Sequence, residues 1–424
     1  MHDLRMVRDE VDALRDGMRR RGKLEEFAPL IDEAVQLDRE RRAGIQAVEE
    51  KKAQRNATTQ EVARRKRAKE NADELMAGAR ALGEEISAME KDLAGTLARL
   101  DELLLGIPNI TLADVPAGGE EANQVVETWG EPREAGSVKP HWEVGAALGL
   151  LDLERGAKIA GSGFVVYRSA GARLVRSLMN AMLDLHTRQF GYEELWVPVV
   201  VKRTTMTGTG QLPKFEDDMY KLEGDDMFLI PTAEVPITNL YRDEILSATD
   251  LPRGFTAYSP CFRREAGSAG KDTRGVLRVH EFDKVELVRY CAPEDGEAQL
   301  ELLVSHAKAA LEHLGLPYRV VLLAAGDTGF ASAKTYDLEV FAPGVGRWLE
   351  VSSCSLCMDF QARRANIRFR PAAGEKPRFV ATLNGSGLAF PRVFAAILEH
   401  YQQPDGSVLV PEELRRWIGT DRIG

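Results

Sequence analysis

The stretch CFRREAGSAGKDTRGVLRVHEFDKVE, residues 261–286, consists of two strand-like halves joined by a charged loop. Its first half places Arg263 and Glu265 two residues apart. Its second half carries a functional side chain at every second position: His280, Phe282, Lys284 and Glu286. Alternate residues of a β-strand lie on one face of the sheet. If the two halves pair, one surface presents a guanidinium, two carboxylates and an aromatic ring.

The loop between these halves is rich in cations and glycines, namely Lys271, Arg274, Arg278, Gly267, Gly270 and Gly275. Guanidinium groups bind phosphate oxygens in pairs, and a phenylalanine facing the same space can stack on a base. A carboxylate beside the ring can accept a hydrogen bond from an exocyclic amine. The pattern therefore predicts a nucleotide site that uses no P-loop. A surface hairpin of cross-strand ion pairs would explain the charges, but neither the glycine loop nor Phe282.

Three other segments carry polar groups at expected element boundaries. Thr232-Ala233-Glu234 follows the strand-like run MFLIP and puts a hydroxyl and a carboxylate on one face. The segment 349–353 is expected to end a strand with a carboxylate and hydroxyls, which are suitable ligands for Mg²⁺. The segment 384–392 is expected to run from a glycine turn into a helix, with Pro391 in the first turn. Taken singly, each segment favours a purely structural role.

The surrounding sequence predicts a mainly antiparallel sheet. Strand-like runs follow one another with short connections, as in 337–341 and 347–354, which are joined by APGVG. Such connections are typical of hairpins. No G-x-G-x-x-G opens a helix after a strand, and no Walker A motif occurs, which argues against a Rossmann or P-loop protein. A few helices, such as 170–189, make the expected fold class α+β.

Residues 28–105 contain no proline after Pro29 and are rich in strong helix formers. Their second half carries apolar residues at steps of three and four, the seam of a coiled coil: Leu82, Ile86, Met89, Leu93, Leu97, Leu100 and Leu104. The first half is weaker, with Ile45, Val48 and Val62. A polar break near 69–73, with Asp73 as the expected N-cap, predicts an antiparallel hairpin of two helices of about 30 residues each.

The charge of the chain is unevenly spread. The 424 residues are 44% hydrophobic and carry a net charge of -10, which fits two or three domains and argues weakly against a general nucleic-acid binder. However, residues 51–69 contain eight Lys or Arg against one acid, whereas residues 70–92 contain seven acids against two bases. By composition alone, the basic segment is expected to be a solvated face.

No apolar run approaches the roughly 18 residues that span a bilayer, and the first residues, MHDLRMVRDE, lack the apolar centre of a signal peptide. The expected compartment is therefore the cytoplasm, with no membrane partner. The four cysteines suggest reduced thiols. Cys354 and Cys357 form a lone C-x-x-C without two further ligands, so no zinc site is expected.

The polar segments resemble the motifs of class II aminoacyl-tRNA synthetases. Phe262–Glu265 with its returning strand looks like motif 2, and Gly385–Arg392 resembles motif 3. The helix 170–189 followed by GYEELWVP resembles the dimer-forming motif 1. Six further stretches are similar to bacterial-type seryl-tRNA synthetases: GTGQLPKF (208–215), PTAEVP (231–236), HEFDKVE (280–286), KTYDLEVF (334–341), EVSSCS (350–355) and DFQARRAN (359–366). With the N-terminal hairpin, the resemblance runs essentially end to end.

This resemblance implies an architecture and a reaction. The catalytic domain, 141–424, would be a class II antiparallel sheet flanked by helices, preceded by a linker at 106–140. Residues 1–105 would be a tRNA-binding arm whose coiled-coil hairpin spans about 30–105. A homodimer would join L-serine to ATP as seryl-adenylate, with Mg²⁺, and pass the seryl group to the 3′ end of tRNA(Ser). The selenocysteine tRNA, tRNA(Sec), is a second candidate substrate.

The resemblance also implies site residues. Those for catalysis are Arg263, Glu350 and Arg392. Those for ATP are Arg263, Arg264, Glu265, Arg278, Val279, Phe282, Glu350, Val351, Ser352, Ser353 and Arg392. Those for serine are Thr232, Ala233, Glu234, Arg263, Glu286, Asn384 and Ser386. Glu350 and Ser353 would hold Mg²⁺. The arm would contact tRNA phosphates through Arg55, Arg64, Arg65, Lys66, Arg67 and Lys69.

The resemblance implies separate contacts for ATP and for serine. Arg263 would hold the α-phosphate and the serine carboxylate, and Arg278 the γ-phosphate. Adenine would lie between Phe282 and Arg392, with its amino group at Glu265. For serine, the implied contacts are Thr232 and Glu234 with the amino group, and Glu286 and Ser386 with the hydroxyl.

Two other functions remain in competition at this stage. A related ligase that loads a carrier protein would lack a tRNA-binding arm, whereas this chain has a basic hairpin. A non-catalytic relative of the synthetases should have lost part of the polar set, yet Arg263, Glu265, Glu286, Glu350 and Arg392 are all present.

Overall fold

The computed structural model describes residues 1–266 and 274–424, so the expected loop residues Gly267, Gly270 and Lys271 lie outside the described part. The chain forms two compact units. The first comprises residues 1–19 and 23–108, and the second comprises residues 20–22 and 109–424. In the described residues, no helix is both long and apolar enough to cross a membrane.

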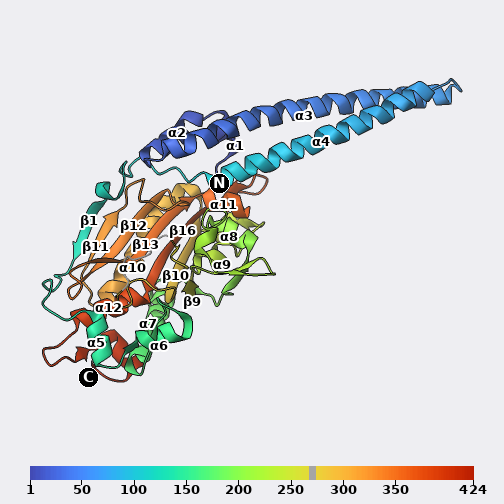
Figure 1. Cartoon of the computed structure of the whole chain (residues 1–424). Coiled ribbons are helices and arrows are strands. Elements are labelled where there is room, and N and C mark those ends of the chain that lie inside the picture. Colours follow the sequence, from blue (N-terminus) through green and yellow to red (C-terminus); the bar gives the residue numbers. More distant parts are fainter. Residues whose placement is uncertain (267–273) are drawn as a thin grey trace. The chain divides into compact units, whose positions relative to one another are not determined.

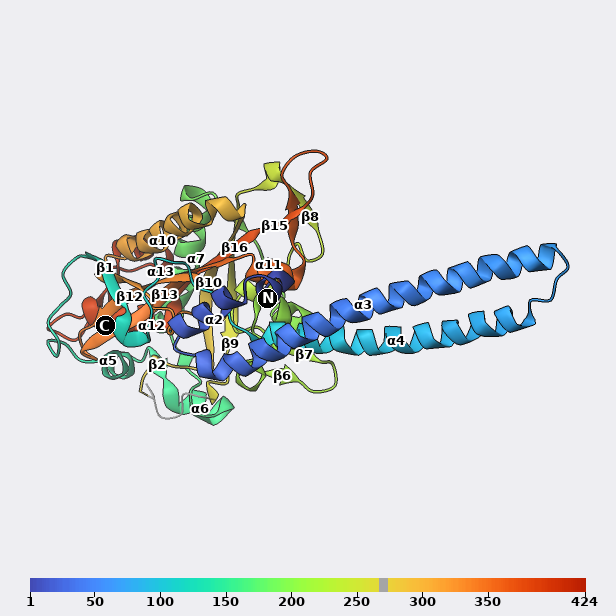
Figure 2. The ribbon, with the colours of Figure 1, turned by 90° about the horizontal axis from the view of Figure 1, so that it is seen from above.

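The first unit is helical, as predicted. Two short helices, α1 (Leu4–Arg8) and α2 (Val11–Arg20), precede the long helices α3 (Leu24–Arg67) and α4 (Asp73–Gly106). The long pair runs antiparallel as a hairpin, which both views show (Figures 1 and 2). Their lengths, 44 and 34 residues, exceed the prediction, because α3 begins before Pro29 and tolerates it near its start.

The seam between the long helices differs in detail from the predicted one. Ile86, Leu100 and Leu104 are buried, but Leu97 is 38% exposed. On α3, Val48 is buried while Ile45 is 40% exposed.

The turn of the hairpin also corrects one expectation. The N-cap of α4 is Ala72, and Asp73 is already the first helical residue. The polar side chain at this turn is Asn71, whose Oδ1 accepts a hydrogen bond from the Asp73 amide at 2.8 Å. Asp73 instead places its negative charge in the first turn, where the helix dipole favours it.

The second unit is built on an eight-stranded sheet, which confirms the antiparallel prediction (Figure 1). Every pair of neighbours is antiparallel except β4 with β9. In spatial order the strands are β1 (Gln124–Trp129), β11 (Tyr318–Leu322), β12 (Lys334–Ala342), β13 (Arg347–Met358), β16 (Ala381–Ala389), β10 (Glu281–Cys291), β9 (Arg253–Phe262) and β4 (Glu193–Glu194).

The segment 106–140, expected to be a linker, contributes to this sheet. It contains a short 3-10 helix, Glu120–Ala122, and the edge strand β1, which pairs with β11. All six residues of β1 are exposed, so the strand lacks the apolar alternation that would have predicted it.

Three longer helices belong to the unit that carries the sheet. Helix α7 (Ala170–Asp184) continues into one π-helical turn to Gln189, which agrees with the predicted helix 170–189. Helix α10 (Gly296–His313) contacts β13 and β16, and helix α12 (Phe390–His400) contacts β10 and β12. Their apolar sides share one large core with the sheet.

The glycines of the motif 3 segment allow buried side chains to pack closely against the sheet. The expected glycine turn is wrong, because Gly385 and Gly387 lie inside the strand β16. A Cβ on Gly385 would lie 2.9 Å from Cys354 Sγ, and one on Gly387 would lie 2.7 Å from His186 Nε2. These glycines therefore let buried side chains approach the sheet closely. The helix follows directly, with Pro391 in its first turn as predicted.

The other elements are short. The helices are α5 (His141–Ala147), α6 (Leu153–Ala160), α8 (Arg203–Thr209), α9 (Glu234–Thr238), α11 (Phe360–Ala365) and α13 (Glu412–Ile418). The strands β5 (Val200–Lys202), β7 (Met227–Leu229) and β6 (Lys221–Leu222) form one small sheet, and β15 (Arg378–Phe379), β14 (Arg368–Arg370) and β8 (Ile245–Ser247) form another. Two strand pairs remain, β2 (Leu151–Asp152) with β3 (Val166–Tyr167) and β17 (Val408–Leu409) with β18 (Arg422–Ile423).

Candidate functional site

One cavity gathers most of the predicted nucleotide-site residues. It encloses about 590 Å³, part of it open to solvent. Its lining combines cations, carboxylates and one aromatic ring: Arg263, Glu265, Val276, Leu277, Arg278, Val279, Phe282, Lys284, Glu350, Val351, Ser386, Ala389, Pro391 and Arg392. Segments far apart in the sequence therefore meet on one face of the sheet.

Arg263 extends the pairing of β9 and β10 by one residue. The strand β9 ends at Phe262, but the Arg263 amide still donates to the His280 carbonyl at 2.9 Å. The guanidinium lies 5.1 Å from the centre of the Phe282 ring, within the range of a cation–π contact. Arg263 Nε donates a long bond, 3.4 Å, to the carbonyl of Pro231. The cation and the aromatic ring thus lie side by side, as the alternation predicted.

Glu265 and Arg278 form an ion pair across the two ends of the motif 2 loop. Glu265 has a φ of +51°, a conformation that non-glycine residues rarely adopt. The backbone on either side of it is held by Asp218, because the Arg264 amide donates to the Asp218 carbonyl at 2.9 Å and the Ala266 amide donates to Asp218 Oδ1 at 3.1 Å. The Arg264 side chain lines a separate surface hollow beside Tyr220.

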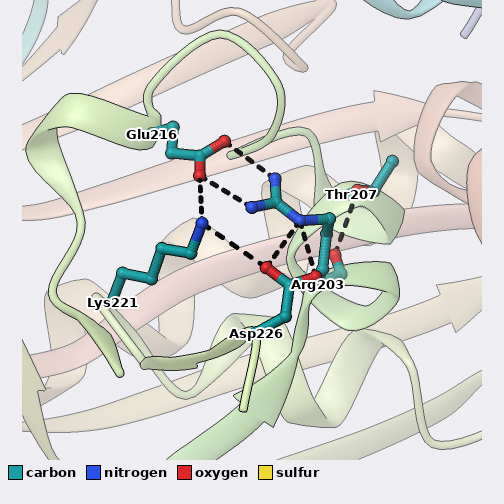
Figure 3. Close-up of polar contacts among 5 residues, drawn as sticks. All are labelled: Arg203, Thr207, Glu216, Lys221 and Asp226. Carbon is teal, nitrogen blue, oxygen red and sulfur yellow. Dashed lines mark hydrogen bonds and ion pairs between the residues drawn. The ribbon is translucent and has the colours of Figure 1, made fainter. Parts of the chain in front are cut away.

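Asp218 belongs to a segment that an ion-pair network supports (Figure 3). Arg203 donates two hydrogen bonds of 2.7 Å to the two oxygens of Glu216 and also bonds Asp226. Lys221 bridges the same two carboxylates at 3.1 Å and 3.5 Å. Arg203 begins α8, whereas the other three side chains lie within 216–226, so the network ties this segment to α8.

Glu350 and Ser353 share a face only because β13 is irregular. The segment 349–353 was expected to end a strand, but it lies inside the twelve-residue β13. Ser352 pairs with Leu338 and Glu350 pairs with Glu339, so the register shifts by one residue at Val351. In a regular strand, residues three apart face opposite sides, and a bulge reverses this. The bulge therefore brings the Glu350 carboxylate to the side of the Ser353 hydroxyl.

Asp337 adds a third oxygen-bearing side chain to this group. It lies opposite Ser353 on β12. Burial and the Glu350 carboxylate raise the pKa of Asp337 well above its usual range, while a hydrogen bond from Ser353 opposes the shift. Asp337 Oδ1 is buried without a hydrogen-bond partner among the described residues. This donor set fits a hard divalent cation, which takes carboxylate and hydroxyl oxygens.

Arg392 closes the cavity from the start of α12. Its Nε donates to the Leu277 carbonyl at 3.1 Å, and its Nη1 donates to the Glu350 carbonyl at 2.7 Å. The Glu350 carboxylate lies 3.5 Å from the same Nη1. Arg392 therefore links the segment before β10 to the bulge of β13.

A second polar group is centred on Lys284, which the sequence analysis placed on the strand but did not assign to the site. Its ammonium forms an ion pair with Glu286 and donates to the Thr232 hydroxyl at 2.9 Å. The Thr232 hydroxyl donates to Glu286 Oε2 at 3.1 Å. The other Glu286 oxygen, Oε1, is buried and has no partner among the described residues. An acceptor of this kind is ready for a ligand hydroxyl.

Glu234 lies close to this group at the start of α9. Burial, followed by the charge of Glu286, raises its pKa from 4.5 to about 7. Gln361, on α11, donates to Glu234 Oε1 at 2.7 Å. Glu234 also lines a second cavity of about 450 Å³ with Asn384, Gln211 and Ser355. Gln361 was not among the predicted site residues, although it lies in the DFQARRAN stretch.

The remaining predicted residues surround these groups. Ala233 is buried and caps α9. The Ser352 hydroxyl donates to the Ser386 carbonyl at 2.7 Å, which joins β13 to β16. The thiols of all four cysteines are free and buried. Burial raises the pKa of Cys291 and of Cys354 to about 12. Within residues 1–266 and 274–424, no set of three His, Cys, Asp or Glu side chains is arranged to hold a metal.

The predicted tRNA-contacting residues lie in the second half of α3 and directly after it. Arg64 and Arg65 form ion pairs with Glu61 at 2.7 Å and 3.1 Å. These two arginines lower the pKa of Glu61 to about 2. Lys66, Arg67 and Lys69 are exposed, and no carboxylate in the described part of the chain forms an ion pair with them. The charge that remains for a partner is therefore concentrated at the end of α3.

Two family models match the chain. The model of the tRNA synthetase class II core domain (G, H, P, S and T) matches residues 214–401. The model of the seryl-tRNA synthetase N-terminal domain matches residues 1–111.

Full-length relatives are similar over the whole chain. The serine–tRNA ligase of Gemmatimonas aurantiaca is 64% identical over 420 residues, 99% of each chain. That of Geobacillus kaustophilus is 54% identical over 422 residues, also 99% of each. The crystal structure of seryl-tRNA synthetase from Pyrococcus horikoshii complexed with ATP superposes with a TM-score of 0.94 at 36% identity, covering 100% of this chain and 99% of that one.

Proposed function

This chain belongs to the seryl-tRNA synthetase family, and we propose that its two units divide the work of an ATP-dependent serine–tRNA ligase. The unit formed by residues 109–424 makes seryl-adenylate from L-serine and ATP and transfers the seryl group to the 3′ end of tRNA(Ser). The helical hairpin binds the tRNA. The observation that carries the proposal is the convergence of Arg263, Phe282, Glu350 and Arg392 on one cavity.

Activation requires in-line attack by the serine carboxylate on the α-phosphorus of ATP. One O–P bond forms while the bond to the pyrophosphate leaving group breaks. Such transfers depend on positioning and charge neutralisation and need no protein nucleophile. Arg263 binds the α-phosphate together with the serine carboxylate, and Arg278 binds the γ-phosphate. The lining positions of both guanidiniums support these roles.

Adenine lies between Phe282 and Arg392, and its amino group donates to Glu265. An aromatic face on one side and a planar guanidinium on the other favour stacking. Support comes from the Arg392 bonds to Leu277 and Glu350, which orient the guanidinium plane. The neighbouring Arg264, Val279, Val351, Ser352 and Ser353 complete the proposed ATP contacts.

Serine lies beside this cavity, with its ammonium group on Glu234 and Thr232 and its hydroxyl on Glu286 and Ser386. Ala233 and Asn384 complete its surroundings. The unpartnered Oε1 of Glu286 supports the hydroxyl contact, because alanine would leave that buried acceptor unsatisfied. Threonine adds only one methyl group, for which packing discriminates by about 1–3 kcal/mol.

Magnesium is proposed to bind at Glu350 and Ser353. When bound there, it supplies positive charge that neutralises the ATP phosphates. Mg²⁺ commonly takes one or two protein carboxylates together with substrate phosphates, which suits this small oxygen set. No zinc is proposed, since the thiols of Cys354 and Cys357 are buried with raised pKa values.

The partners follow from the family. We propose that the basic end of α3, with Arg55, Arg64, Arg65, Lys66, Arg67 and Lys69, contacts phosphates of tRNA(Ser). A homodimer through the motif 1 region is supported by Trp196, whose side chain is 78% exposed in the GYEELWVP stretch of that motif. The proposed compartment is the cytoplasm, where ATP and tRNA are available.

The test is pyrophosphate exchange with the purified chain. We expect exchange of labelled pyrophosphate into ATP only when L-serine is present, and esterification of tRNA(Ser) but not of a tRNA for another amino acid. Charging of tRNA(Sec) is measured in the same assay. Exchange driven by another amino acid, without exchange on serine, would overturn the proposal.

A further inference from the structure

We call residues 275–279, which precede β10 in motif 2, the return segment. Helix α12 holds two consecutive residues of this segment. Arg392 and Glu399 lie seven residues apart on this helix, which is two turns, so they share one side of it. Arg392 Nε donates directly to the Leu277 carbonyl at 3.1 Å. Glu399 reaches the preceding residue, Val276, through a third side chain, His141.

His141 connects these two points by hydrogen bonds. The side chains of His141 and Glu399 are both fully buried. His141 Nδ1 lies 2.8 Å from Glu399 Oε1, and the Val276 amide lies 3.2 Å from His141 Nε2. Because a backbone amide can only donate, Nε2 must be the acceptor. The ring proton therefore lies on Nδ1 and is donated to Glu399.

Glu399 is held by backbone amides from two further segments. Oε1 also accepts from the His141 amide at 2.9 Å, at the start of α5. Oε2 accepts from the amides of Gly344 and Val345 at 2.8 Å and 3.4 Å, in the turn between β12 and β13. A buried carboxylate with this many donors has a defined orientation. It therefore fixes the imidazole that faces the return segment.

Gly275 shows how closely this segment approaches His141. Its φ is +67°, and a Cβ built on it would lie 2.1 Å from His141 Nε2 and 2.9 Å from Trp142 Cε3. Only glycine fits both the conformation and the space. The next residues, Val276, Leu277, Arg278 and Val279, all line the nucleotide cavity. The contact with His141 thus comes immediately before four lining residues.

We propose that His141 and Glu399 are positioning residues for the ATP half of the site. By holding the Val276 amide, they set the return segment so that the Leu277 carbonyl meets Arg392 and Arg278 meets Glu265. The proposal rests on the function proposed above. It assigns the effect to ATP rather than to serine, because the proposed serine contacts, apart from Arg263, come from β10, from β16 and from the start of α9 with the two residues before it.

Two substitutions at His141 separate positioning from folding. His141→Asn keeps an amide at the Nδ1 position for Glu399 but leaves the Val276 amide without an acceptor. His141→Gln keeps an oxygen that can reach this amide. We expect hydrogen–deuterium exchange at 275–279 to rise in the Asn variant only. In pyrophosphate exchange, the Asn variant raises KM for ATP about three- to tenfold and leaves KM for serine within about twofold, and the Gln variant restores KM for ATP.

Equal changes in the two KM values, or unchanged hydrogen exchange at 275–279 in the Asn variant, would overturn the proposal. If the Asn variant fails to fold, Gly275→Ala replaces it, with Gly374→Ala as the control. Gly374 has a φ of +86° with open space around its Cβ position, so the control carries the same kind of strain without the contact. We expect a raised KM for ATP only with Gly275→Ala, and equal effects contradict the proposal. Hydrogen exchange is measured without catalysis, so it tests the positioning role by itself. Serine-dependent pyrophosphate exchange by the unmodified chain tests the proposed function separately.

Discussion

The side-chain amide of Gln361 donates a 2.7 Å hydrogen bond to Glu234 Oε1, and both side chains are buried. The same amide nitrogen donates to the Thr209 carbonyl at 3.1 Å, and the amide oxygen accepts from the Thr382 hydroxyl at 2.7 Å. These partners fix which way the amide points. Glu234 therefore meets a neutral donor, which only partly offsets its burial and the neighbouring charge of Glu286.

We predict that serine affinity depends on the ionisation of Glu234. Its pKa is raised to about 7, so the carboxylate is mostly protonated at pH 6 and mostly ionised at pH 8. Because the serine ammonium group pairs with the ionised form, the Kd for serine should fall about tenfold from pH 6 to pH 8. Calorimetric titration of the unmodified chain and of Glu234→Gln measures this, and the variant should bind weakly at both pH values. A pH-independent Kd for the unmodified chain contradicts the assignment.

The same pKa predicts a pH-dependent stability. A carboxyl group whose pKa is raised on folding binds its proton more tightly in the native state. Its contribution is therefore fully present below the unfolded pKa, near 4.5, and is lost as the pH rises through about 7. Relative to Glu234→Gln, the free energy of unfolding of the unmodified chain should fall by about 2–3 kcal/mol between pH 5 and pH 8. Urea unfolding at both pH values checks this, and parallel stability profiles would exclude it.

Lys284 is predicted to be essential for stability. Lys284→Met leaves Glu286 as a buried carboxylate without its cation, which costs about 3–5 kcal/mol. Lys308→Met is the matched control, because its partner Glu127 is about half exposed and such pairs contribute about 1 kcal/mol or less. Denaturant unfolding compares the two variants. Equal losses would show that the Lys284 pair is not desolvated as the burial indicates.

Arg263 is predicted to be essential for activation. Arg263→Ala should lower serine-dependent pyrophosphate exchange by about two to three orders of magnitude, since it removes the cation aimed at the reacting phosphate. Arg253→Ala is the control, because this arginine also lies over an aromatic ring, 5.2 Å from Phe255, at the other end of β9. Circular dichroism confirms that both variants are folded. Near-normal exchange by Arg263→Ala would place the phosphate site elsewhere.

The arm is predicted to act on tRNA and not on ATP. Removing residues 45–95 should leave pyrophosphate exchange intact but abolish tRNA charging. The two ends of this deletion lie near the same level of the hairpin, because a Cβ built on Gly44 would lie 3.4 Å from Cδ1 of Leu93 on the opposite helix.

A single reversal refines this test. Lys66→Glu should weaken tRNA binding and reduce the salt dependence of binding by about one released ion. Lys91→Glu is the control, because Lys91 is an exposed residue on the acidic returning helix, and it should leave both quantities unchanged. Unchanged charging after the deletion refutes the role of the arm.

The periodicity of the sequence was sufficient for the elements that depend on local pattern. Steps of three and four residues predicted the α3–α4 hairpin, and alternation along 280–286 predicted that Phe282, Lys284 and Glu286 face one side. The edge strand β1 escaped prediction, because all its residues are exposed and its pairing with β11 comes from distant chain.

The arrangement of the site was likewise determined partly by local sequence pattern and partly by tertiary structure. Residue types and strand alternation determined that cations, carboxylates and Phe282 share a surface, because the two-residue period of a strand is a local property. The side of the sheet that Glu350 occupies was decided by a bulge, which exists only against the partner strand β12. The hydrogen bond from Val276 to His141, which Glu399 orients, and the raised pKa of Glu234 likewise depend on the tertiary structure. Burial and hydrogen bonds between residues more than a hundred positions apart arise only when the chain is packed.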